Sequence, residues 1–343
     1  MVIRQTGAAV RLAVLGAAHG HVGFALDEAA RRDDVVLVAA AESDAASRSA
    51  FLAGLGDVPL YDDVATLLDR HEVDVAVVAG VYAQRGAAAV AALEAGAHVL
   101  ADKPLCTSLE QLDAVAAAAA RTGRHVSVMF EKRFYPATLA ARRLLDDGTL
   151  GDLALVASTG PHKLRLADRP PWFLRRDGYG GIAADLPVHD IDLVLALSGA
   201  TSGTVAALTG TTGAAGGADF DDHVAVLLRA GSAAATLEAS WLSPEAADLH
   251  GHYRMRLTGS RGTAELDWAY GTVQVATHDR APWSEPLPPG RPPAAYFFDA
   301  VAAGAEPEIS TAASLLATRV ALLAQASADS GGSPLPWSAA GHE

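Results

Sequence analysis

One short segment places a lysine where an open sheet would present it to a ligand. The apolar run Val99–Ala101 is followed at once by Asp102, Lys103 and Pro104. Ligands of open α/β sheets bind at the carboxyl ends of the strands, so both charged side chains are expected there. Removing a lysine from water costs free energy unless the lysine is paired or takes part in chemistry. Lys103 is therefore a candidate catalytic cation.

A carboxylate and an imidazole occur four positions apart in the second half of the chain. These residues are Asp185 and His189. Residues four apart on a helix share one face, so both side chains could enter one cleft. An imidazole exchanges protons near neutral pH, and a carboxylate can orient its partner. Alone, such a pair is usually a helix-surface contact; combined with Lys103, it indicates proton transfer.

A glycine turn near the start of the chain is typical of dinucleotide binding. Gly16 and Gly20 follow the apolar run Leu12–Leu15 and precede a helical stretch. The GxGxxG fingerprint is incomplete, because Ala18 and His21 replace its second and third glycines. The turn would bring backbone N–H groups to a pyrophosphate at the helix N-terminus. The alternative is a plain strand–helix turn without a ligand.

An acid follows the second apolar run of this region. Glu42 comes directly after Val35–Ala41. A carboxylate there accepts hydrogen bonds from both ribose hydroxyls and repels a 2′-phosphate, which favours NAD over NADP. The alternative is a solvated surface acid.

Two histidines, His19 and His21, lie in the same turn. Without a carboxylate expected near them they make a poor metal site, so no metal is predicted. We expect them to line the nucleotide turn or to cap the helix that follows.

The distribution of apolar runs predicts two domains of different architecture. Over residues 1–130, strand-like runs alternate with helical stretches and predict a Rossmann domain with a doubly wound parallel sheet. The expected strands are Leu12–Leu15, Val35–Ala41, Val75–Ala79, Val99–Ala101 and Val126–Phe130, with helices over Gln84–Ala95 and Leu109–Arg121. Residues 131–343 predict an α+β domain with a large open mixed or antiparallel sheet and helices on one face.

Several segments of the second domain carry this expectation. Helices are expected over 137–146, 187–197 and 312–326, an exposed loop over 281–293, and a frayed tail after Gly331. The expected strands are Leu155–Ser158, Thr204–Leu208, His223–Leu228, Ala233–Trp241, Tyr253–Thr258, Gly262–Asp267 and Thr272–Ala276. The open sheet would expose alternating apolar residues, which predicts a homodimer or homotetramer.

Charge and composition exclude several partners. The formal net charge of −14 opposes binding to nucleic acid phosphates. The sequence has neither a dense Lys/Arg run nor an apolar run long enough to span a bilayer, so no membrane partner is expected. A single cysteine, Cys106, is typical of a cytoplasmic protein.

Five segments in order resemble one known family. Besides the glycine turn, they are Val73–Val75, Ala92–Val99, Asp102-Lys103-Pro104, Arg133-Phe134-Tyr135-Pro136 and Gly180–Asp192. Together they resemble the Gfo/Idh/MocA (glucose-fructose oxidoreductase, inositol dehydrogenase, MocA) family from about residue 11 to 199. Each match is modest, but their shared order is specific.

The resemblance implies an active site. Its catalytic group would be Lys103, Asp185 and His189, with either Lys103 or His189 as the proton acceptor. The residues implied for the cofactor NAD are Gly16, Ala18, His19, Gly20, His21, Glu42, Gly80, Arg85, Asp102 and Lys103. Those implied or expected for the substrate are Lys103, Arg133, His162, Lys163, Trp172, Asp185 and His189. For Arg133 a structural ion pair is an equal alternative, and Asp192 would form an ion pair or a cap.

Three departures affect this assignment. Gly80-Val81 replaces the family's Thr-Pro at the end of the fourth strand, and Arg85 takes the place of a following histidine. Pro187 stands between Asp185 and His189, where proline suits a first helical turn.

The sequence thus predicts an NAD-dependent oxidoreductase. It would move a hydride between nicotinamide and a hydroxyl-bearing carbon of a sugar, cyclitol or related polyol. One alternative is a glycoside hydrolase that recycles bound NAD; another is a non-catalytic dinucleotide-binding regulator.

Overall fold

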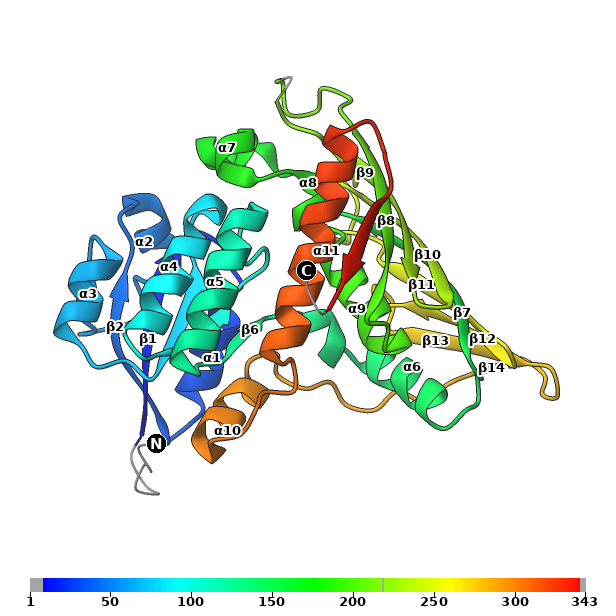
Figure 1. Ribbon diagram of the computed structural model, residues 1–343, viewed down its shortest axis with the longest axis horizontal. Helices are drawn as coiled ribbons and strands as arrows, with labels where there is room; N and C mark the ends of the chain where they lie inside the picture. Colours follow the sequence, from blue (N-terminus) through cyan, green and yellow to red (C-terminus); the bar gives the residue numbers. More distant parts are fainter. Residues whose placement is uncertain (1–8, 218, 340–343) are drawn as a thin grey trace. The chain divides into compact units, whose positions relative to one another are not determined.

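The structure, a computed structural model, describes residues 9–217 and 219–339 and consists of two compact units (Figure 1). Unit 1 contains the chain up to Met129 together with Pro292–Leu315. Unit 2 contains Phe130–Arg291 and the chain from Leu316 onward. The predicted domains, 1–130 and 131–343, are each one continuous stretch, whereas unit 1 also contains Pro292–Leu315. The division at residue 130 stays a prediction.

Unit 1 is built on a six-stranded parallel sheet in the order β3-β2-β1-β4-β5-β6, as predicted for a doubly wound fold. The strands are β1 (Val10–Ala17), β2 (Val35–Ala41), β3 (Leu60–Tyr61), β4 (Val75–Ala79), β5 (His98–Ala101) and β6 (Val126–Val128). β4 is buried along its whole length, which explains its unbroken apolar sequence. The parallel order brings the ends of β1, β4 and β5 to one edge.

Helices connect these strands, and polar side chains cap several of them. They are α1 (Val22–Ala30), α2 (Ala45–Phe51), α3 (Val64–Arg70), α4 (Tyr82–Glu94), α5 (Leu109–Thr122) and the late α10 (Ala295–Ala303). Asp44, Asp63 and Ser108 accept N–H bonds at the starts of α2, α3 and α5. Gly123 ends α5 with a φ of 66°.

Unit 2 contains a nine-stranded mixed sheet in the order β14-β13-β12-β11-β7-β10-β9-β8-β15. The strands are β7 (Leu153–Pro161), β8 (Ser202–Gly210), β9 (His223–Ala230), β10 (Ala233–Ser240), β11 (Arg254–Gly259), β12 (Gly262–Asp267), β13 (Thr272–Thr277), β14 (Trp283–Ser284) and β15 (Leu335–Ser338). β7 and β10 pair in parallel and the other neighbours are antiparallel, so the predicted mixed sheet is confirmed.

The end of the chain differs from the expectation. The tail after Gly331 was expected to fray, but β15 pairs with β8 as an edge strand. Burial of Trp337, which is 2% exposed, holds it there. Residues 340–343 lie outside the described part. The expected loop over 281–293 contains the two-residue strand β14.

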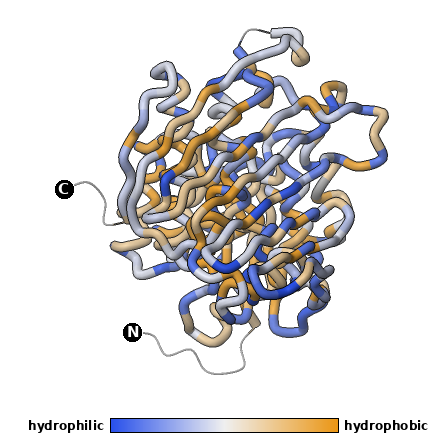
Figure 2. Tube along the Cα trace, turned by 90° about the vertical axis from the view of Figure 1, so that its right-hand side faces the viewer, coloured by the Kyte–Doolittle hydropathy of each residue, from blue (hydrophilic) through white to orange (hydrophobic). Residues whose placement is uncertain are grey.

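Helices cover one face of the large sheet. They are α6 (Pro136–Asp146), α8 (Ile182–Asp185) and α9 (Val188–Ser198). Two further helices follow other parts of the chain, the short α7 (Arg176–Tyr179) and the long α11 (Thr311–Asp329). Along β9, buried and exposed residues alternate, as a sheet with one covered face requires. Figure 2 looks onto the uncovered side and shows hydrophobic and hydrophilic stretches mixed along its strands. Among the described residues, no helix combines the length and apolarity needed to cross a bilayer.

The contact between α10 and β6 within unit 1 can be tested at Ser127. Its buried hydroxyl lies 2.6 Å from the Tyr296 hydroxyl and donates to the Ile309 carbonyl at 2.8 Å. We expect Ser127→Ala to lower the free energy of unfolding by about 1–3 kcal/mol, because it leaves buried partners unsatisfied. Urea denaturation measures this, with the exposed Ser49→Ala as control. Equal stability of both variants would contradict the assignment.

Candidate active site

The glycine turn of unit 1 brings two strand ends into contact. Gly16 has a φ of +84°, and a Cβ built on it would lie 2.5 Å from the Cα of Gly80. The N–H of Ala18 donates to the carbonyl of Ala79 at 2.9 Å. Close approach and positive φ therefore both require glycine at position 16. The turn then passes through Gly20 into α1.

Glu42 closes one side of this turn. Its carboxylate is 7% exposed and accepts the N–H groups of Ala17 at 2.7 Å and Asp44 at 2.9 Å. Each oxygen keeps a lone pair for a further donor. A pocket of about 410 Å³ adjoins it, with Gly16, Glu42, Gly80 and Arg85 among its lining residues. A carboxylate acceptor beside a glycine turn and a helix N-terminus fits the ribose and pyrophosphate of a dinucleotide.

Asp102 is the centre of a buried polar cluster in unit 1. Its Oδ2 lies 2.8 Å from Nδ1 of His19 and 2.9 Å from a guanidinium nitrogen of Arg85. Its Oδ1 lies 3.0 Å from Nδ1 of His21. Burial opposes ionisation of Asp102, but His19, Arg85 and His21 outweigh it and hold the pKa of this carboxyl well below its usual range. Burial lowers the pKa of His19 to about 4, although Asp102 acts in the opposite direction.

The two histidines differ from what the sequence led us to expect. His21 occupies the N-cap position of α1, but its side chain makes no cap bond and faces Asp102 instead. The expectation that no carboxylate lies near them is wrong: potential ligand atoms of His19, His21 and Asp102 lie within 4.8 Å of one another. His21 and Asp102 are 81 positions apart in the chain, so their contact could not be predicted from local spacing. Arg85 on the same carboxylate adds positive charge and opposes a cation there.

Arg85 fastens the ends of β4 and β5 together. Its Nε donates to the Gly80 carbonyl at 2.8 Å, and one terminal nitrogen donates to the carbonyls of Lys103 at 2.7 Å and Pro104 at 3.1 Å. The guanidinium also lies 4.3 Å from the Tyr82 ring centre. Arg85 is fully buried and its hydrogen bonds hold this backbone in place, while its contact with a cofactor stays a prediction. Lys103 itself is 4% exposed, and the Lys103–Pro104 peptide is cis.

In unit 2, Asp185 and His189 do not share one helix. Asp185 is the last residue of α8, and His189 lies in the first turn of α9. Pro187 between them has no N–H to donate to a preceding carbonyl, and the helix expected over 187–197 begins at Val188, after Asp185. The one-face argument from their spacing is therefore wrong. Both side chains are nevertheless buried, at 0% and 3% exposure.

A hydrogen-bonded chain that the sequence did not reveal holds Asp185. The indole Nε1 of Trp241 donates to the Tyr179 hydroxyl at 2.9 Å, and that hydroxyl donates to Oδ2 of Asp185 at 2.8 Å. All three side chains are buried. Donation to a carboxylate fixes its orientation. Tyr179 is thus a positioning residue for Asp185.

His189 has a buried carboxylate next to its ring. Nδ1 of His189 lies 3.4 Å from Oε2 of Glu131, and the ring contacts Phe130 edge-to-face. This contact is within ion-pair distance and places a carboxylate beside the ring. Burial, followed by the charge of Glu131, raises the pKa of Tyr135 above its usual range.

Arg133 and its neighbour form structural ion pairs. Two guanidinium nitrogens of Arg133 lie 2.6 and 2.5 Å from the carboxylate of Asp192, and Lys132 pairs with Asp190 at 2.8 Å. Of the alternatives for Asp192, the ion pair is the one observed. This engagement favours a structural role for Arg133, and its contact with substrate stays a prediction.

Two of the remaining predicted substrate residues, His162 and Lys163, directly follow β7, and the third, Trp172, lies further along the chain. Nδ1 of His162 is 2.9 Å from the Gly160 carbonyl, and its ring lies 5.4 Å from Trp241. Lys163 is buried and donates to the carbonyl of Ala247. Trp172 stacks edge-to-face on Phe173 in a 3₁₀ segment, Pro171–Leu174. His162 thus contacts Trp241, the first member of the chain that holds Asp185, and the Lys163 ammonium donates to backbone.

Comparison with known proteins identifies the family. Residues 10–130 match the model of the oxidoreductase family with an NAD-binding Rossmann fold, and residues 138–265 match the GFO/IDH/MocA C-terminal domain. The chain belongs to the Gfo/Idh/MocA family of oxidoreductases. It is an NAD-binding enzyme, as the glycine turn and Glu42 predicted.

Several relatives carry more specific names. Inositol 2-dehydrogenase of Rhizobium meliloti is 28% identical over 79% of each chain. D-glucoside 3-dehydrogenase of Escherichia coli is 26% identical over 57% of this chain and 56% of its own. The solved oxidoreductase domain protein of Kribbella flavida is 25% identical with a TM-score of 0.80, covering 96% of this chain and 99% of its own.

The role of Tyr179 can be tested by removing one oxygen. We expect Tyr179→Phe to lower kcat roughly tenfold, because it removes one hydrogen bond to a buried carboxylate. The KM for NAD should not change, since NAD binding belongs to unit 1. Steady-state kinetics measures both, with the exposed Tyr270→Phe as the matched control. An unchanged kcat would rule out the positioning role.

Proposed function

We propose that this oxidoreductase transfers a hydride between NAD and a hydroxyl-bearing carbon of a sugar, cyclitol or related polyol. The observation that carries the proposal is the pair of buried, oriented acid–base groups in unit 2, Asp185 and His189. Relatives named for inositol and D-glucoside substrates support the substrate class. The cofactor residues of unit 1 support the same reaction.

Each group has a proposed role in oxidation of an alcohol. Lys103 stabilises the alkoxide that develops on the substrate oxygen. Either His189, through Nε2, or Lys103 accepts the hydroxyl proton, and Asp185 orients the substrate or the base. Bound NAD supplies the nicotinamide carbon that accepts the hydride.

The cofactor contacts are proposed from the turn. Backbone groups of Gly16, Ala18 and Gly20 would face the pyrophosphate, with His19 and His21 lining the same turn. The carboxylate of Glu42 would accept the ribose hydroxyls. Gly80 and Arg85 shape the loop behind the pocket, and Asp102 fixes this loop to the turn.

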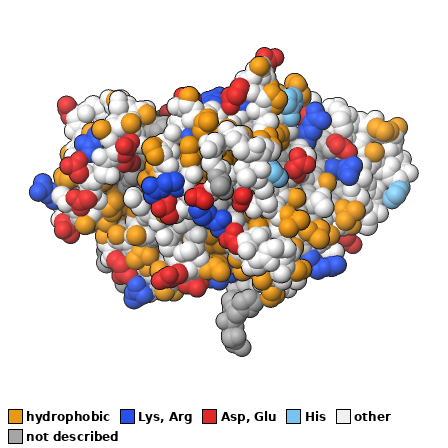
Figure 3. All heavy atoms as spheres, turned by 90° about the horizontal axis from the view of Figure 1, so that it is seen from above, with side chains coloured by type: hydrophobic (Ala, Val, Ile, Leu, Met, Phe, Trp, Pro, Cys, Tyr) orange, Lys and Arg blue, Asp and Glu red, His pale blue; other side chains and the backbone are white. Residues whose placement is uncertain are grey.

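The partners follow from charge and from the open sheet. Acidic and basic side chains are interspersed on the face drawn in Figure 3, which together with the net charge of −14 disfavours a nucleic acid partner. The single cysteine is buried and supports a cytoplasmic location. Leu155, Leu208 and Leu227, each more than half exposed on the uncovered sheet face, support assembly into a homodimer or homotetramer.

The activity can be tested with NAD and a panel of cyclitols, aldoses, glycosides and sugar acids. We expect NADH to form with at least one polyol. The rate of NADH formation should be at least a thousandfold lower in Lys103→Met, because that variant lacks the cation and one candidate base. Activity retained in Lys103→Met would contradict the assignment. Hydrolysis of a glycoside without NADH formation would favour the NAD-recycling hydrolase.

The oligomer can be tested on the same preparation. We expect light scattering to give the mass of a dimer or tetramer, and Leu227→Asp to give monomers by placing charge in an apolar interface. The exposed Leu60→Asp in unit 1 is the control. A monomeric wild-type protein would exclude this assembly.

A further inference from the structure

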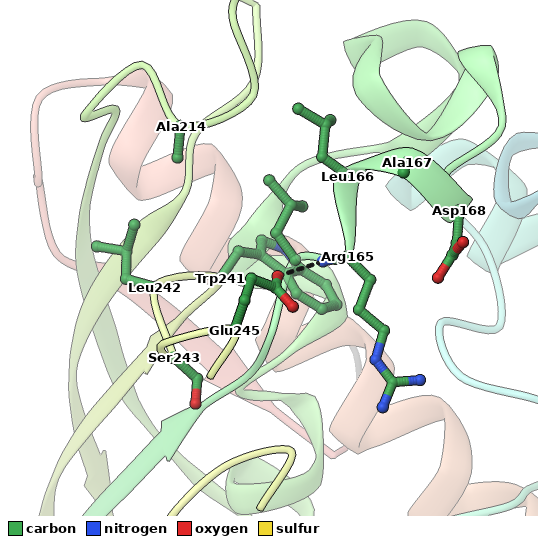
Figure 4. Close-up of a pocket in the computed structure, with 10 residues that line it drawn as sticks. Arg165, Leu166, Ala167, Asp168, Ala214, Trp241, Leu242, Ser243 and Glu245 are labelled. Carbon is green, nitrogen blue, oxygen red and sulfur yellow. Dashed lines mark hydrogen bonds between the residues drawn. The ribbon is translucent and has the colours of Figure 1, made fainter. Parts of the chain in front are cut away.

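A second pocket lies in unit 2, beyond the residues assigned to the reaction. It encloses about 770 Å³ and is shown in Figure 4. Its walls come from three segments: 164–168, Ala214 and 241–245. We propose that it binds the aglycone of a glycoside, so that the substrate is a sugar carrying an apolar or aromatic group. This inference rests on the proposed function and specifies its substrate.

Backbone contacts hold the two main walls together. Lys163 and Leu242 form an isolated β-bridge, and the Ser243 N–H donates to the His162 carbonyl at 3.0 Å. The Arg165 N–H donates to Oε1 of Glu245 at 2.8 Å, drawn as the dashed line in Figure 4. Arg165 has a φ of +48°, a backbone conformation that residues other than glycine rarely adopt. Such strain persists only where surrounding contacts impose it, so the pocket is preformed.

Trp241 connects this pocket to the proposed reaction site. It lines the pocket and donates its indole N–H to Tyr179, which in turn bonds Asp185. The segment 164–168 also follows His162 and Lys163 directly in sequence. Two side chains, Trp241 and Tyr179, therefore connect the pocket to Asp185.

The lining indicates what the pocket would bind. Leu166 and Leu242 are 40% and 41% exposed, and they share the walls with Leu164 and Trp241. Large apolar side chains left accessible in a preformed pocket gain free energy when a ligand covers them. Arg165, Ser243 and Glu245 add a few polar groups that could orient a glycosidic or phenolic oxygen. A free monosaccharide would leave the leucines uncovered, whereas an aglycone would cover them.

The kinetic test compares phenyl with methyl glycosides of glucose, galactose and xylose. We expect wild-type kcat/KM, followed as NADH, to favour the phenyl glycoside by about tenfold, and Leu242→Ser and Leu166→Ser each to reduce that preference roughly fivefold. Leu60→Ser is the matched control, since Leu60 is equally exposed at 41% but lies in unit 1 outside the pocket. It should keep the preference.

A binding test separates this inference from the reaction itself. Calorimetric titration of phenyl glycosides into the protein with NADH, which accepts no hydride, reports the subsite without turnover. Binding that weakens in Leu242→Ser, with no NADH formed from any sugar, would uphold the pocket and overturn the proposed function. NADH formed equally from methyl and phenyl glycosides would uphold the function and overturn the pocket. Failure of every phenyl glycoside to bind at millimolar concentration, or a preference for disaccharides, would also overturn the aglycone assignment.

Discussion

The buried negative charge of Asp102 is the constraint on which the nucleotide end of unit 1 depends. Arg85 and Asp102 are both fully buried, and an isolated charge in such a place would cost several kcal/mol. Their pairing removes that cost and joins the ends of β4 and β5. His21 attaches the glycine turn to the same carboxylate, and His19 lies beside it. One side chain thus sets the relative positions of the turn, the cofactor loop and the backbone of Lys103.

Unit 2 also buries charged and polar side chains, and it places them in pairs. Of its proposed acid–base groups, Asp185 accepts a hydrogen bond from Tyr179, and His189 lies beside the Glu131 carboxylate. The neighbouring residues Asp190 and Asp192 are neutralised by Lys132 and Arg133. Burial raises the pKa of Asp192 despite Arg133, which shows how costly charge is in this region. Fixed groups of this kind need little reorganisation when charge develops on a substrate.

Local pattern was enough to predict most of the elements. The apolar runs of β2 and β4, the alternating pattern of β12 and the glycine that ends α5 carry their signals within a few residues. The signals for α10 and β15 are not local. Tyr296 reaches Ser127 from 169 positions away, and β15 depends on an edge strand much earlier in the chain.

The site was predictable in its residue types but not in its contacts. The family motif identifies Asp102, yet its bond to His21 spans 81 positions and no spacing rule covers it. Tyr179 and Trp241 were missed because their hydrogen bond joins residues 62 positions apart, and no motif marks either one. Pro187 was visible, but its interruption of the helix between Asp185 and His189 needed the backbone path.

The central claim, that the Arg85–Asp102 pair organises the nucleotide end of unit 1, is tested most directly by a double-mutant cycle. The free energy of unfolding would be measured for the wild type, Arg85→Gln, Asp102→Asn and the double variant. We predict that each single change lowers the free energy of unfolding by about 3–5 kcal/mol, because it leaves one buried charge without its partner. The double variant, which buries neither charge, should lose far less than the sum of the two. Additive losses would contradict the account.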